Sequence, residues 1–169
     1  VKIDLEPSHV ADCIDEVGIG FLFAPLYHGA MKQCAGVRQE MGIRTILNVL
    51  GPLANPAGAT HQVLGVYDAK WTDILGRVLL ELGSQHCFVM HGLDGLDEIT
   101  LSDRTRVAEG KAGVVSSYFI APEEFDVRRT PRKEFAGGSP EENARITKEI
   151  LQGRKGARRT CGPGATACG

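Results

Sequence analysis

Three carboxylates lie close together in GLDGLDEIT, residues 92–100 of this 169-residue chain. Asp94, Asp97 and Glu98 follow an apolar run directly, and glycines between them let the backbone bend. Such oxygen ligands suit a hard cation such as Mg²⁺, which binds one or two carboxylates and retains waters or substrate phosphates. The alternative is a polar loop facing solvent, and spacing alone favours that alternative.

Four further residues could bind a small ligand. Arg38 could grip a planar carboxylate through two hydrogen bonds, although the sequence alone favours a surface arginine paired with an acid such as Glu40. His28 follows APLY, where a packed or capping histidine is commoner than a catalyst. Gly51 and Pro52 form either a simple turn or a stiff wall against which a flat aromatic ligand could lie.

The elements around the acidic turn are predicted by hydrophobic periodicity. Residues 61–68 and 86–92 are typical of strands, and 69–83 of a helix, an order that favours a parallel pair with a right-handed crossover. Residues 106–120 alternate about GKAG as two antiparallel strands do. The inward face of the helix is expected to consist of Trp71, Ile74, Leu75, Val78 and Leu82.

Length and composition indicate one domain with a real core. A formal net charge of -2 makes nucleic acid an unlikely partner, and no apolar run is long enough to cross a membrane. Five cysteines without CxxC spacing favour a cytoplasmic setting. The charged stretch 125–135 is expected to face solvent, and the glycine-rich residues 161–169 are expected to form an unstructured tail.

Several long segments, in this order and spacing, resemble anthranilate phosphoribosyltransferases: GIGFLFAPLYHGAMK, VRQEMGIRTILNVLGPLANPAG, QVLGVYD and VMHGLDGLDEITL. The resemblance implies a partial phosphoribosyltransferase α/β domain over residues 1–160. Its fold would be a central mixed, mainly parallel sheet flanked by helices. The implied activity is transfer of the phosphoribosyl group from phosphoribosyl pyrophosphate to anthranilate, a step of tryptophan biosynthesis.

The same resemblance implies roles for particular residues. Arg38 would bind the anthranilate carboxylate, and His28, Gly51 and Pro52 would line the same pocket. Asp97 and Glu98 would bind Mg²⁺, with Mn²⁺ as the other candidate cation. The full-length enzyme is expected to be a homodimer.

The sequence also departs from the family. The family's small helical domain and its G-T-G-G-D phosphate loop have no counterpart here, so we expect a fragment that is inactive in isolation. Gly29 replaces a usual proline beside His28. Two alternatives remain: a non-catalytic relative that binds a nucleotide or nucleic acid, and a nucleoside phosphorylase. The balanced charge argues against the first, and Arg38 argues against the second.

Overall fold

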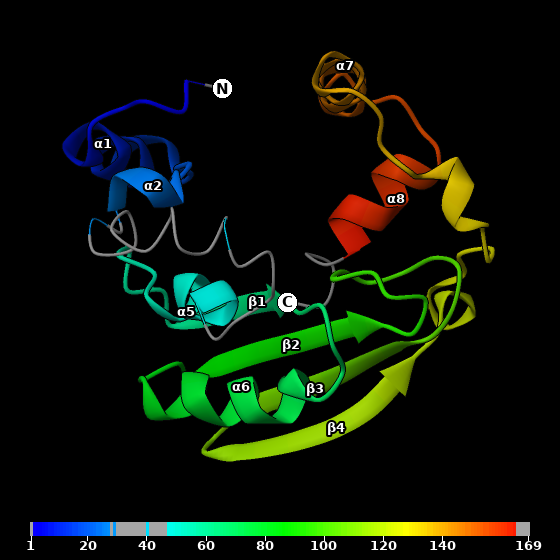
Figure 1. Ribbon diagram of the computed structural model, residues 1–169, viewed down its shortest axis with the longest axis horizontal. Coiled ribbons are helices and arrows are strands. Elements are labelled where there is room, and N and C mark those ends of the chain that lie inside the picture. The colour runs from blue at the N-terminus through cyan, green and yellow to red at the C-terminus, as the bar shows by residue number, and fades with distance from the viewer. Residues whose placement is uncertain (1, 28, 30–39, 41–46, 165–169) are drawn as a thin grey trace. The chain divides into compact units, whose positions relative to one another are not determined.

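The computed structural model describes residues 2–27, 29, 40 and 47–164 (Figure 1). The chain divides into two compact units, Val1–Ala59 and Thr60–Gly169, and each is described by itself. No helix among the described residues combines the length and apolar character that a membrane crossing requires.

The described part of the first unit is helical. Helix α1 spans Pro7–Val17, begins with proline in its first turn and ends at Gly18, whose φ of 81° is the left-handed conformation common at helix ends. Helix α2 spans Ala24–Tyr27, and α5 spans Leu47–Leu53.

The second unit contains a four-stranded sheet with the order β1-β2-β3-β4. Its strands are β1 His61–Gly65, β2 His86–Gly92, β3 Thr105–Lys111 and β4 Val114–Ile120. β1 and β2 pair in parallel, with His61 opposite His86. The other two pairings are antiparallel, and Ala112 and Gly113, both with positive φ, form the tight turn between β3 and β4.

The predicted α/β class and mixed sheet are confirmed, as are the parallel pair and the hairpin. The expectation of a mainly parallel sheet is not met by the described strands, because two of their three pairings are antiparallel. A hairpin needs only a tight turn, whereas each further parallel strand would need its own crossover segment.

Helix α6, Trp71–Glu81, lies across one face of this sheet and contacts β2, β3 and β4 (Figure 1). Its buried residues are Thr72, Leu75, Gly76 and Leu79. The predicted inward face was wrong at Ile74 and Leu82, which are 49% and 61% exposed, whereas Leu75 is buried and Trp71 and Val78 are partly buried. A buried threonine sets the true face: the Thr72 hydroxyl donates to the Ala69 carbonyl and accepts from Arg106 Nε at 3.0 Å.

The opposite face of the sheet carries a separate apolar cluster of Phe88, Met90, Ile99, Val107 and Ile120. Ile99 belongs to the segment that follows the acidic turn, so this cluster anchors one end of that segment in the core. The acidic turn thus leaves a buried strand and returns to a buried residue.

The chain ends in short helices. These are η1 Pro122–Phe125, η2 Arg132–Glu134, α7 Pro140–Leu151 and α8 Ala157–Gly164. Ser139 and Glu142 form a reciprocal capping box at the start of α7. The tail predicted over 161–169 was wrong for 161–164, which continue α8, and 165–169 lie outside the described residues.

Candidate functional site

The acidic turn begins where β2 ends at Gly92. The Gly95 amide donates to the Gly92 carbonyl at 2.8 Å, and the Gly92 amide donates to the Leu96 carbonyl at 2.8 Å. Gly95 has a φ of 86°, a conformation that side chains rarely adopt. The Leu93 amide donates to the Arg104 carbonyl at 2.9 Å, which ties the turn to the residue preceding β3.

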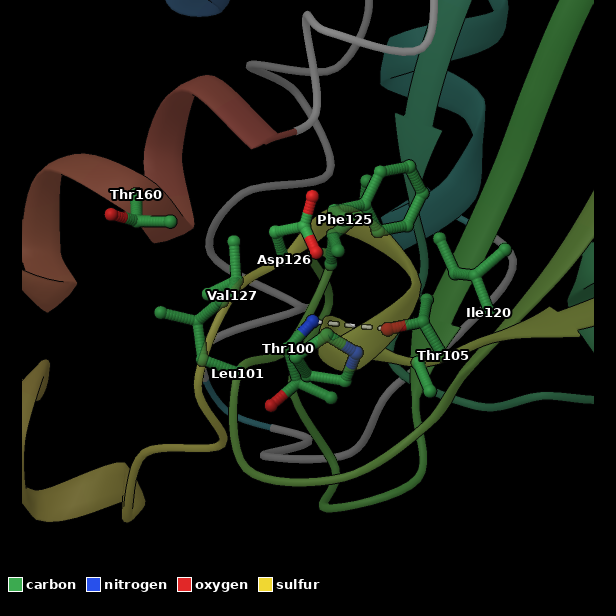
Figure 2. Close-up of a pocket in the computed structure, with 11 residues that line it drawn as sticks. Thr100, Leu101, Thr105, Ile120, Phe125, Asp126, Val127 and Thr160 are labelled. Atoms are coloured by element: carbon green, nitrogen blue, oxygen red, sulfur yellow. Dashed lines mark hydrogen bonds between the residues drawn. The ribbon is translucent and has the colours of Figure 1, made fainter.

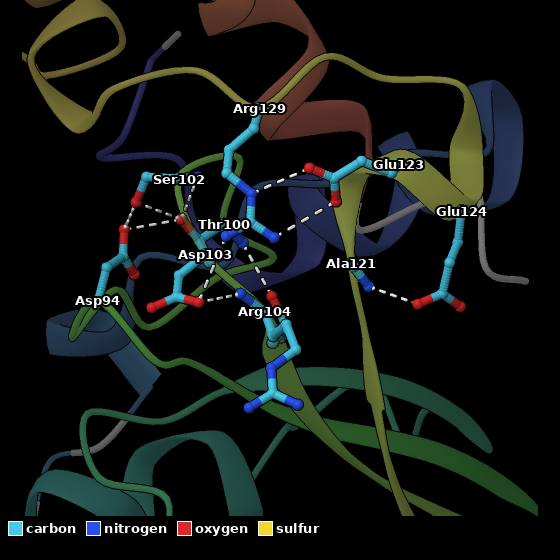
Figure 3. A network of polar contacts seen from close by, with 10 residues as sticks. Asp94, Thr100, Ser102, Asp103, Arg104, Ala121, Glu123, Glu124 and Arg129 are labelled. Carbon is cyan, nitrogen blue, oxygen red and sulfur yellow. Dashed lines mark hydrogen bonds and ion pairs between the residues drawn. The ribbon is translucent and has the colours of Figure 1, made fainter.

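Asp94 is fully engaged by its own loop (Figure 3). One carboxylate oxygen, Oδ2, accepts from the hydroxyls of Thr100, at 2.7 Å, and Ser102. The other, Oδ1, accepts from the Leu96 amide at 3.2 Å. Burial alone would raise the pKa of Asp94, but the hydrogen bonds from Ser102 and Thr100 outweigh it and lower the pKa.

An arginine side chain from a distant part of the sequence contacts the acidic turn. Arg132 Nη1 donates to the backbone carbonyl of Asp94 at 2.9 Å, and its charge also lowers the pKa of Asp94. The stretch 125–135 is mostly exposed, as predicted, but this arginine also holds the acidic turn. Sequence reasoning did not single it out, because nothing local links residues 38 positions apart.

Asp97 and Glu98 are in a different state from Asp94. Both residues are exposed, and no hydrogen bond or ion pair to their carboxylates is found within the described residues. Burial of the Glu98 carboxyl by surrounding protein raises its pKa although the residue as a whole is exposed, and the negative charge of Asp97 raises that pKa further. Within the part of the chain that the structure describes, these two adjacent carboxylates have no protein cation.

Two glycines at strand ends make room for this loop. A Cβ at Gly65, the last residue of β1, would lie 1.7 Å from the Asp97 carbonyl oxygen, which no side chain allows. A Cβ at Gly92 would lie 2.7 Å from Asp94 Oδ1 and 3.0 Å from the Thr100 Cβ. The loop therefore crosses the C-terminal ends of the parallel strands at backbone distance, the edge where α/β sheets place their ligands.

This arrangement fits a two-carboxylate cation site rather than a three-carboxylate one. Among the residues that the structure describes, no group of three His, Cys, Asp or Glu side chains is placed to hold a metal ion. Asp94 accepts from two hydroxyls, whereas no described residue donates to the carboxylates of Asp97 and Glu98. Mg²⁺ commonly binds through one or two carboxylates and completes its shell with water and substrate phosphates.

The predicted acceptor residues belong to the first unit. Gly51 and Pro52 lie in the last turn of helix α5 rather than in a simple turn, with Pro52 exposed and Gly51 partly buried. His28 and Arg38 lie outside the described residues. Their roles remain predictions.

A second polar cluster, built around the single carboxylate of Asp73, lies between α6 and the sheet. Asp73 accepts from Arg106 Nη2 at 2.6 Å, from Thr72 Oγ1 at 3.2 Å and from the Ser117 hydroxyl. The hydrogen bonds from Ser117 and then Arg106 lower the pKa of Asp73 to about 2. These contacts join a helix to β3 and β4, so the cluster is structural.

An apolar cavity of about 430 Å³ adjoins the end of the acidic segment (Figure 2). Its walls include Ile99, Leu101, Ile120, Phe125 and Val127. The charged side chain in its lining is that of Asp126, which has the sign of a phosphate, so the cavity does not suit an anionic ligand.

These features define a class: a mixed α/β domain with a glycine-bounded acidic loop at the C-terminal edge of its parallel strands. Residues 1–161 match the family described as "Glycosyl transferase family, a/b domain". The chain belongs to that family.

Individual relatives make the likeness more specific. An anthranilate phosphoribosyltransferase from Anaeromyxobacter dehalogenans is 54% identical over 159 residues, which are 94% of this chain and 47% of the relative. The crystal structure of the Thermus thermophilus anthranilate phosphoribosyltransferase has a TM-score of 0.86 and 41% identity, over 95% of this chain and 47% of that one. The Saccharomyces cerevisiae enzyme in complex with PRPP (phosphoribosyl pyrophosphate) and Mg has a TM-score of 0.79 and 28% identity, over 91% and 44%.

The chain spans about half the length of the curated relatives it matches.

Proposed function

We propose that this chain takes part in transfer of the phosphoribosyl group from PRPP to anthranilate, with Mg²⁺ bound through Asp97 and Glu98. The observation that carries the proposal is the exposed Asp97–Glu98 pair beyond β2, which none of the described residues engages, in a chain of the glycosyl transferase family. Support also comes from relatives named for this reaction and from one solved with PRPP and Mg.

Asp97 and Glu98 could assist a diphosphate leaving group only by binding a cation. Two carboxylates would repel a diphosphate, so they can assist it only through a cation held between them and the substrate. When bound, Mg²⁺ would neutralise the charge that develops on the departing diphosphate. Arg132 Nη1 donates to the Asp94 carbonyl, and Arg132 forms no ion pair with Asp97 or Glu98.

The acceptor side of the proposal rests on the first unit. Arg38 would pair with the anthranilate carboxylate, His28 would line the pocket, and Gly51 and Pro52 would form a wall against the aromatic ring. In the reaction the anthranilate nitrogen forms a bond to ribose C1, while the bond from C1 to the diphosphate oxygen breaks and its electron pair leaves with the diphosphate. The amine proton is lost to water. Positioning and leaving-group electrostatics carry most of such a step.

A chimera tests the proposal directly. The segments of the Anaeromyxobacter dehalogenans relative that flank its matched half would be fused to this chain, and loss of anthranilate fluorescence would be followed with PRPP and Mg²⁺. We expect turnover by the chimera and none by the 169-residue chain alone. A folded chimera that leaves anthranilate unchanged would contradict the proposal, and phosphorolysis of a nucleoside by it would favour the nucleoside phosphorylase alternative.

Arg38→Ala in the same chimera tests the acceptor site. Loss of a charge-assisted pair should weaken anthranilate binding by about 1 to 3 kcal/mol, with little change in the KM for PRPP. Unchanged affinity for anthranilate would remove Arg38 from the acceptor site.

A homodimer and a cytoplasmic location are also proposed for the complete enzyme. The homodimer rests on the resemblance, and sedimentation of the chimera would test it. The cytoplasmic location rests on the cysteine pattern, with Cys13, Cys87 and Cys161 free. Fractionation of cells that produce the complete enzyme would test it.

A further inference from the structure

The three carboxylates of the acidic turn differ in their hydrogen bonds, and this difference indicates that they have different roles. Asp94 Oδ2 accepts two hydroxyl hydrogen bonds and Oδ1 accepts a backbone amide. Asp97 and Glu98 accept none from the residues that the structure describes. Asp94 is thus committed to protein donors, and its two neighbours are available.

The hydrogen-bond donors to Asp94 lie in the sequence on both sides of Asp97 and Glu98. The Leu96 amide lies on the N-terminal side of Asp97, and Thr100 and Ser102 lie on the C-terminal side of Glu98. The Thr100 hydroxyl also accepts from the Ser102 amide at 3.0 Å, so the two hydroxyl donors are themselves held in place. One side chain therefore fixes both ends of the segment that carries the pair.

Other contacts hold the segment from Asp94 to Ser102 against the sheet. The Thr100 amide donates to Thr105 Oγ1, at the start of β3, at 3.0 Å. The Asp97 carbonyl lies in the space that a side chain on Gly65 would fill, at the end of β1. Arg132 Nη1 donates to the Asp94 carbonyl, and no ion pair joins its guanidinium to Asp97 or Glu98.

We propose that Asp94 is a positioning residue that locks the turn through Thr100 and Ser102, so that Asp97 and Glu98 present their carboxylates together to a divalent cation. This inference rests on the proposed cation role of Asp97 and Glu98. Asp94 itself does not contact the cation.

The test uses the 169-residue chain and Mn²⁺ alone, with free Mn²⁺ measured by electron paramagnetic resonance. Asp94→Asn should weaken Mn²⁺ binding by roughly tenfold, the lower end of the usual loss when a group that orients metal ligands is removed. Asp73→Asn is the matched control, because it removes an equally engaged carboxylate from another cluster and should leave Mn²⁺ affinity unchanged.

A second pair of variants guards against misfolding. Thr100→Val removes the hydroxyl with little change of shape and should weaken Mn²⁺ binding, whereas Thr100→Ser keeps the hydroxyl and should retain it. Amide hydrogen exchange of residues 92–102, measured without metal, should be faster in Thr100→Val than in Thr100→Ser. A loss that followed side-chain volume rather than the hydroxyl would overturn the positioning role.

The remaining outcomes separate this inference from the proposed function. If Asp97→Asn with Glu98→Gln abolishes Mn²⁺ binding and Asp94→Asn does not change it, the cation pair stands and the positioning role is wrong. If Asp94→Asn weakens binding as much as removal of both Asp97 and Glu98 carboxylates, Asp94 is a ligand and the inference fails. If the wild-type chain binds no Mn²⁺, the cation pair and the positioning role both fail.

Discussion

Two carboxylates of the second unit, Asp73 and Glu98, have opposite electrostatic surroundings. Asp73 is held by a guanidinium and two hydroxyls, and its pKa is lowered to about 2. Glu98 has no such partner among the described residues, and burial and the charge of Asp97 raise its pKa. A fold tolerates an unfavourable charge pair only if the rest of the structure holds it, and such pairs concentrate at functional sites. The comparison separates a carboxylate that joins a helix to the sheet from one for which we propose a ligand role.

The largest effect should come from removing the available pair. In the active chimera, Asp97→Asn with Glu98→Gln should lower kcat/KM by about 100-fold or more, because a metal's charge stabilisation is worth several kcal/mol. Asp73→Asn should change kcat/KM little at a temperature where the protein stays folded. Steady-state kinetics at saturating Mg²⁺ would check both. Equal losses in the two variants would mean that the clusters do not differ in function.

For the free energy of unfolding, substitution of Asp73 should have a larger effect than substitution of Asp97. Asp73→Ala should lower the free energy of unfolding by about 1 to 2 kcal/mol, since it removes the ion-pair partner of Arg106 but the pair is about a third exposed. Urea unfolding followed by the fluorescence of the single tryptophan, Trp71 in α6, would measure this. Asp97→Asn is the control and should change the free energy of unfolding far less. An unaltered midpoint for Asp73→Ala would show that this cluster does not stabilise the fold.

Acid should weaken the same cluster. The folded pKa of Asp73, about 2, lies below its ordinary value of 3.8, so its contribution is full above pH 3.8 and is lost as pH falls toward 2. Exposure reduces the contribution to about 1 kcal/mol. The difference in unfolding free energy between wild type and Asp73→Asn should therefore shrink across this window. A difference that stayed constant from about pH 5 to about pH 2 would contradict the assigned pKa.

Local features of this fold were predictable from the sequence. The parallel pair, the crossover helix and the hairpin all follow from short-range periodicity and turn chemistry. The inward face of α6 was not, because Thr72 is buried by hydrogen bonds to Ala69 and Arg106 that no apolar pattern reveals. Polar residues enter a core when their partners are there, and those partners can lie far along the chain.

The candidate site likewise contains features that the sequence predicts and features that it does not. The acidic turn and its exposed Asp97 and Glu98 could be located from residue types and glycine spacing. Thr100 and Ser102 lie close enough to Asp94 that local side-chain hydrogen bonding could have suggested them. Gly65 and Arg132 could not be assigned a role, because each acts on the turn only after the sheet has formed.

The smallest expected effect is a gain in stability from Glu98→Gln. The folded pKa of Glu98 lies above its ordinary value of 4.5, so its ionised form opposes folding, and the penalty grows as pH rises from 4.5 through the folded pKa. Glu98→Gln should thus raise the free energy of unfolding by about 0.5 kcal/mol or less at neutral pH without metal, and by nothing below about pH 4. Asp97→Asn should give a smaller gain, because it removes only the repulsion and leaves the burial that contributes most to the raised pKa of Glu98. With saturating Mn²⁺ the wild type should instead have a higher free energy of unfolding than the variants, since the cation stabilises the wild type and not the variants. Urea titrations at neutral pH with and without Mn²⁺ would decide, and a loss of stability in metal-free Glu98→Gln would mean that Glu98 has a structural partner and belongs with Asp73.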